Sequence, residues 1–138
     1  MVLTVSSDLC TTQDLFKKPS HFSNRLIVPI TISHDDAKGG PNYYIQLEGI
    51  AIYPPIFPNG AKPILVTCNL CDVQPCGKSF TNMLSMVYGN EKFTRPKVPA
   101  RLGKTEEIII EIKTINNNDV NNVTSVSVQL SLVPAENY

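Results

Sequence analysis

The chain has 138 residues, of which 42% are apolar and 17% are charged, and its twelve basic and twelve acidic side chains leave no formal net charge. This composition favours a folded domain over a disordered chain, and the length fits one domain that spans residues 1–138. Electrical neutrality argues against a nucleic-acid or anionic-membrane surface, because both need an excess of Lys and Arg.

Two features bear on location. No apolar run approaches the roughly 20 residues that a membrane-spanning helix needs, and the start, Met1–Ser6, lacks the charged start and long apolar core of a signal peptide. We therefore expect no membrane span and no secretion by a signal peptide. The expected site of synthesis is the cytoplasm or the nucleus.

Eleven prolines are spread along the whole chain. Proline ends helices and is confined to turns and to the edges of sheets, so a long helix has few places to form. The chain is therefore predicted to be all-β.

The first twenty residues allow several interpretations. Val2–Val5 fits a short edge strand, whereas Asp8–Lys18 fits one helical turn or an N-terminal arm that is ordered against a neighbouring subunit. A frayed terminus explains the same residues equally well.

The next stretch, Leu26–Ile32, is β-branched and apolar, and alternation places every second residue on one face. Pro29 cannot donate a ladder hydrogen bond, so we expect an edge strand or a bulge there. The residues expected on the shared face are Leu26, Val28, Ile30 and Ile32.

Residues 34–42 carry the signals of a loop. A strand is expected over Tyr44–Tyr53, with a bulge at Gly49, followed by a proline-rich turn over 54–60 and another strand over Pro63–Leu70. Phe80–Tyr88 fits a strand or a helical turn, and we favour the strand.

The last third shows the clearest alternation. Ser125–Leu132 alternates without a break, and Glu107–Lys113 does so with the single exception of Ile109 on the polar face. An asparagine-rich stretch, 115–122, separates them and is typical of a loop. The natural interpretation is a final hairpin whose apolar faces need a second layer to cover them. With the earlier strands, this predicts an antiparallel two-sheet sandwich of jelly-roll type with six to eight strands.

The cysteines Cys68, Cys71 and Cys76 form a C-x2-C-x4-C pattern. A structural zinc site needs four ligands, and only Cys10, His21 or His34 could complete the set. Because Cys68 falls in an expected strand and faces the core, we favour reduced structural thiols over zinc. No cofactor or metal is expected.

A catalytic set is not evident either. The loop carboxylates Asp35 and Asp36 beside His34 are typical of solvated turn residues, so we predict that the protein is not an enzyme. The basic residues between Arg95 and Lys104 are interpreted as a solvated connection rather than a phosphate-binding surface, because Glu106 and Glu107 follow at once.

Aromatic residues beside stiff proline loops are candidates for a protein interface, since aromatic side chains anchor many contacts. Ordinary packing between the sheets explains them equally well. The candidates are Tyr43, Tyr44, Tyr53 and Phe57.

Several short segments follow one another in a recognisable order. They are Ser23–Ile30, Tyr44–Leu47, Cys71-Asp72 before Pro75 and Gly77, Met83-Leu84, and Phe93, Pro96 and Pro99 ahead of Glu107–Ile112. This succession resembles small β-sandwich virion proteins of Maverick/Polinton-type DNA elements and related DNA viruses. It covers roughly residues 20–133 and does not include Cys68 or Cys76. The resemblance implies a minor capsid, penton-like or attachment role, with no catalytic residues to carry over.

Two functional hypotheses follow. The first is a non-enzymatic virion structural protein that works through contacts with its own copies or with other capsid proteins. The alternative is a ligand- or glycan-binding β-sandwich module that uses the loops 34–42 and 54–60.

Overall fold

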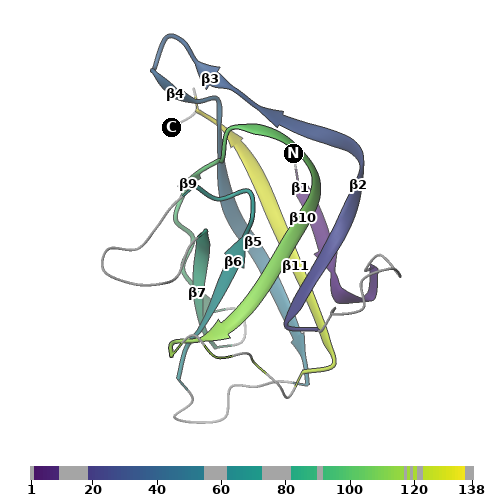
Figure 1. Ribbon diagram of the computed structural model, residues 1–138. Coiled ribbons are helices and arrows are strands. Elements are labelled where there is room, and N and C mark those ends of the chain that lie inside the picture. Colours follow the sequence, from purple (N-terminus) through teal and green to yellow (C-terminus); the bar gives the residue numbers. More distant parts are fainter. Residues whose placement is uncertain are drawn as a thin grey trace.

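The protein is an antiparallel β-sandwich, seen here in a computed structural model that describes residues 2–9, 19–54, 62–72, 82–89, 92–116, 118, 120 and 123–135 (Figure 1). Only the backbone of Leu9 is described. Helix is limited to one 3-10 turn, η1 (Ser7–Leu9), within these residues. No helix in them is long and apolar enough to cross a membrane.

Two sheets form the body of the molecule. Sheet A contains, in spatial order, β1 (Val2–Ser6), β11 (Ser125–Pro134), β5 (Tyr43–Tyr53) and β9 (Val98–Pro99). Sheet B contains β2 (His21–Ile32), β10 (Gly103–Thr114), β6 (Ile64–Cys68), β7 (Met83–Gly89) and β8 (Lys92–Phe93). A small hairpin of β3 (His34–Asp35) and β4 (Gly40–Pro41) projects from one end (Figure 1).

The strands pair in a nested order. When β3, β4 and β8 are set aside, eight strands remain among the described residues, and they pair from the chain ends inward: β1 with β11, β2 with β10, β5 with β9, and β6 with β7. In addition, β11 pairs with β5, and β10 pairs with β6. This order rolls one long antiparallel ribbon into two facing sheets, which is the jelly-roll topology. The predicted fold class is confirmed.

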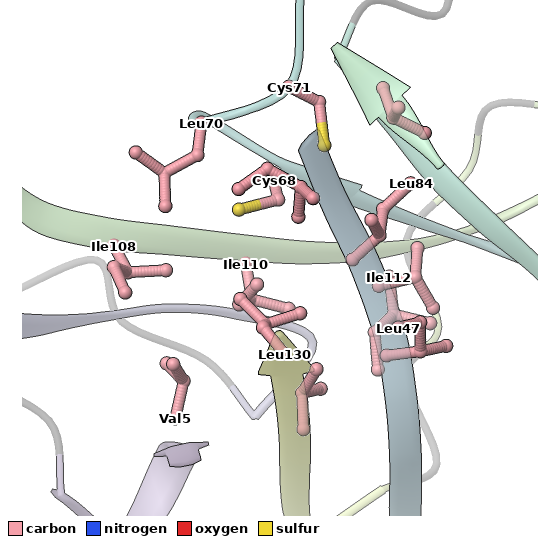
Figure 2. Close-up of a cluster of buried hydrophobic side chains, with 14 of the residues drawn as sticks. Val5, Leu47, Cys68, Leu70, Cys71, Leu84, Ile108, Ile110, Ile112 and Leu130 are labelled. Atoms are coloured by element: carbon pink, nitrogen blue, oxygen red, sulfur yellow. The ribbon is translucent and has the colours of Figure 1, made fainter. Parts of the chain in front are cut away.

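The core lies between the two sheets (Figure 2). From sheet B, β10 contributes Ile108, Ile110 and Ile112, which are fully buried. Opposite them, β11 contributes Val126, Val128 and Leu130, and each is at most 1% exposed. Alternation along each strand therefore sends one face inward and leaves the other to water.

The predicted final hairpin is wrong. β10 pairs with β2 and β6, whereas β11 pairs with β1 and β5, so the two strands lie in different sheets. In Figure 1, β10 crosses in front of β11. The physical reason is that two apolar faces cover each other when they face across a sandwich, but need a further layer when they lie side by side in one sheet.

Several local predictions are confirmed. The segment from Phe80 to Tyr88, as far as it is described, is the strand β7. The register between β5 and β11 shifts beside Gly49, as expected for a bulge. Ile109 is 37% exposed on the outer face of β10, and Val2 begins an edge strand of sheet A.

A buried asparagine links the two sheets at one corner. The side chain of Asn24 in β2 accepts a hydrogen bond from the Ser6 amide at 2.9 Å and donates one to the Ser6 carbonyl at 2.9 Å. Both residues are only 8% exposed. Asn24 therefore satisfies both backbone groups of Ser6 at the end of β1, where water has little access.

The variant Asn24→Ala is expected to lower the free energy of unfolding by about 1–3 kcal/mol, because it leaves buried polar groups of Ser6 without partners. Chemical denaturation of the wild type and the variant measures this difference. Asn42→Ala is the matched control, since its side chain bonds Ser33 at an exposed position and should cost at most about 0.5 kcal/mol. Equal losses in both variants would contradict the role of Asn24.

Candidate docking groove

A large bulge interrupts β2, which is an edge strand of sheet B. The register of β10 against β2 shifts between Thr105 and Glu107. Their partners are Ile30 and Arg25, so the whole segment Leu26–Pro29 faces only one residue of β10. This segment, which we call the β2 bulge, therefore lies outside the ladder, and the strand bends around it.

The β2 bulge exposes apolar side chains. Ile27 is fully exposed and Val28 is 73% exposed. Fully burying a side chain of this type contributes about 1.5–3 kcal/mol relative to leaving it in water, so the fold forgoes that stabilisation at two successive residues. The expectation that Val28 shares one face with Leu26, Ile30 and Ile32 is wrong, because Val28 is exposed whereas Ile32 is buried, and alternation holds only where a strand stays in its ladder.

A groove of about 490 Å³ lies beside the β2 bulge. One wall is the stretch from Arg25 to Thr31, and the other side is formed by Leu3 of β1, Leu132 of β11 and Tyr43 of β5. Leu132 is 4% exposed and belongs to the core. The groove therefore runs from the exposed bulge toward the interior, between the edges of the two sheets.

The predicted interface aromatics do not gather in one place. Tyr43 is half-buried and lines the groove, and Tyr44 follows it in β5. Tyr53 is 68% exposed at the opposite end of the same strand, about 33 Å away at 3.3 Å per residue. Phe57 lies outside the described residues. Of the three candidates that the structure describes, Tyr43 alone lines the groove, whereas the residues of the bulge were not among the predicted interface residues.

A signal for the bulge was present in the sequence. Pro29 predicted an edge or a bulge, and both occur. The apolar character of the neighbouring residues, however, made the whole stretch look like an ordinary buried strand.

The cysteines Cys68 and Cys71 are free thiols inside the core (Figure 2). The Cys71 amide donates to the Cys68 carbonyl at 3.1 Å in the turn after β6. A hydrogen bond between the two thiols, and then burial, raise the pKa of Cys71 well above its usual value. The interpretation of Cys68 and Cys71 as reduced structural thiols rather than zinc ligands stays a prediction. Cys76, the third predicted ligand, lies outside the described residues.

Other polar residues singled out in the sequence have local roles. The side chain of Asp35 accepts a hydrogen bond from the Ala37 amide at 3.1 Å and shapes the β3–β4 turn. His21 lies 3.4 Å from Glu111 on the surface, while His34 is in β3, beyond the other end of β2. Across the described ranges, no three His, Cys, Asp or Glu side chains are grouped so that they could hold a metal ion.

Comparisons of the chain with protein-family models, with curated proteins and with solved structures found no match.

Cys68 and Cys71 are expected to resist alkylation in the folded protein, because both are buried and the raised pKa keeps Cys71 protonated. A short iodoacetamide pulse at mildly alkaline pH, followed by peptide mass spectrometry, should label them only after urea is added. Labelling of Cys71 at the same rate with and without urea would contradict its placement. Stoichiometric zinc in the purified protein would contradict the assignment of reduced thiols.

Proposed function

We propose that this chain is a non-enzymatic structural protein of a virion, in a minor capsid, penton-like or attachment role, that works through contacts between subunits. The single observation that carries the proposal is the apolar β2 bulge beside the groove. The proposal assigns no catalytic step to the chain.

The jelly-roll topology is compatible with the proposal. Jelly rolls form capsid proteins, but they also form lectins and cupins, so the fold admits a virion role together with others. The exposed apolar edge of β2 favours contact with another subunit. Natural edge strands are usually kept short, charged or covered, whereas β2 presents an isoleucine and a valine to water.

A second copy of this chain is the partner that we propose for the groove. Twelve basic and twelve acidic side chains balance, so copies approach each other without long-range repulsion. Ten residues line the groove, whereas a standard interface takes about 20–30 residues from each side. The groove is therefore the anchor of a larger contact, with Ile27 and Val28 as its most exposed apolar residues.

The double variant Ile27→Ser and Val28→Ser is expected to weaken self-association by at least about a hundredfold, because each apolar side chain buried in a contact contributes about 1.5–3 kcal/mol. Sedimentation velocity over a wide concentration range measures this. The fold should be retained, since exposed substitutions usually change stability by at most about 0.5 kcal/mol.

Tyr88→Ser is the matched control, because Tyr88 is 52% exposed on β7 and does not line the groove. It should associate as the wild type does. A wild-type chain that stays monomeric at every concentration would contradict self-association. If particles purified from the producing cells contain the chain in a fixed ratio to their major capsid protein, the virion role is supported, and its absence from such particles would contradict it.

A ligand- or glycan-binding module is the second candidate. The observation that favours it is a polar hollow of about 730 Å³ on the outer face of sheet B. Of the loops first considered for this function, 34–42 forms the β3–β4 hairpin, while 55–60 lies outside the described residues. A virion protein can carry both functions, because the groove proposed for subunit contacts and this hollow have only Arg25 in common.

A further inference from the structure

A second concave surface, which we call the β10 hollow, lies on the outer face of sheet B. It has a volume of about 730 Å³, within the range of about 300–1,000 Å³ that is common for ligand pockets. Its walls come from β2, the turn after β6, and the start of β10 with the connection before it. Segments that are distant in the sequence therefore converge on it.

Three cationic side chains line the β10 hollow: Arg25, Arg101 and Lys104. The Lys104 ammonium is 3.7 Å from Glu106, but both side chains are more than 60% exposed, so this pair is weak. Neither arginine has an ion-pair partner among the residues that the structure describes. Both guanidinium groups are therefore available to an oxyanion, which they can bind through two parallel hydrogen bonds.

Arg95, which lies in the same basic stretch as Arg101, differs from Arg25 and Arg101 because its charge is paired. Arg95 forms an ion pair with Glu48 and also donates to the Leu47 carbonyl at 3.3 Å. Through these contacts Arg95 links the connection before β9 to β5. The basic stretch predicted as a solvated connection thus has two parts, and its second part reaches the β10 hollow.

Two carboxylates, Glu106 and Glu107, line the same hollow. Against three cations they leave one positive charge in excess. A ligand with one negative charge matches this excess, whereas a chain of phosphates or sulfates would bring several anions close to the two carboxylates. Carboxylates accept hydrogen bonds only, so they suit a ligand that also carries hydroxyl donors.

The wall beside these groups is held in place. The Asn69 amide donates to the Glu107 carbonyl at 2.8 Å, and its oxygen accepts from the Ile109 amide at 2.9 Å. These bonds fasten the turn after β6 to β10. A wall that is already ordered loses little conformational entropy when a ligand binds.

Apolar side chains complete the hollow. Leu102 is 40% exposed and Ile109 is 37% exposed, and both line it. The carbon–hydrogen face of a sugar ring can pack on such side chains while its hydroxyls and its carboxylate reach the polar groups. Pockets for small ligands commonly combine these two kinds of lining.

We propose that the β10 hollow binds an acidic sugar, that is, a ring with one carboxylate and several hydroxyls, such as a uronic or sialic acid residue of a glycan. Arg25 and Arg101 bind the carboxylate, Glu106 and Glu107 accept hydroxyl hydrogen bonds, and Leu102 and Ile109 contact the ring. This inference does not depend on self-association, because the groove and the hollow share only Arg25.

Calorimetric titration tests this with four probes: the methyl glycosides of glucuronic acid and of a sialic acid, the neutral methyl galactoside, and inorganic phosphate. At least one acidic glycoside should bind the wild type at least about tenfold more tightly than the neutral one. The reason is that the binding free energy of a hydrogen bond to a charged group corresponds to about a tenfold change in affinity or more. Arg101→Gln should weaken this binding by about tenfold to a hundredfold. Lys62→Gln, at an exposed lysine outside the hollow, should leave it unchanged.

A further variant separates sugar recognition from simple attraction of anions. Glu107→Ala removes a negative charge, so phosphate should bind more tightly, whereas the sugar loses a hydroxyl contact. The ratio of sugar affinity to phosphate affinity should therefore fall. Circular dichroism verifies that each variant is folded.

Three outcomes would overturn the proposal. They are equal binding of the acidic and neutral glycosides, binding of the acidic glycoside that folded Arg101→Gln leaves unchanged, and no binding of either acidic glycoside at millimolar concentration. Loss of self-association in the Ile27→Ser and Val28→Ser variant would not affect this test, so the two proposals can fail separately.

Discussion

The structure depends on the burial of two alternating apolar faces against each other. β10 and β11 each pair with a strand on both sides, and their inward residues, Ile108, Ile110 and Ile112 facing Val126, Val128 and Leu130, are almost completely buried. Each such side chain contributes about 1.5–3 kcal/mol on burial. The other strands extend these two sheets outward.

The sequence predicted which residues of these strands face inward, because alternation is a local property of an extended chain. It did not predict which strands pair, because pairing depends on residues far away. Hairpin loops usually have about 2–5 residues, whereas Ile115 to Thr124 is much longer. That length was the available sign that the chain passes from one sheet to the other between β10 and β11.

The same distinction explains why the candidate site was only partly predicted. Pro29 indicated a break in the ladder through its missing N–H, which is a property of one residue. The size of the bulge is set by the register of β10 on either side of it, and that register depends on both strands rather than on the pattern within β2 alone. The β10 hollow was harder still to foresee, because Arg25 and Arg101 are distant in the sequence and line one hollow only when β2 pairs with β10.

Arg25 connects the two surfaces. It is the last residue of β2 that pairs with β10 before the β2 bulge begins, and it lines both the groove and the β10 hollow. A neighbour in the groove would restrict the rotamers of this side chain, and an anion in the hollow would do the same. If both proposals hold, any effect of one binding event on the affinity of the other would pass through this shared side chain, and such a coupling would be equal in both directions. The shared position of Arg25 follows from the register of β2 against β10, since this residue pairs with Glu107 immediately before the β2 bulge begins.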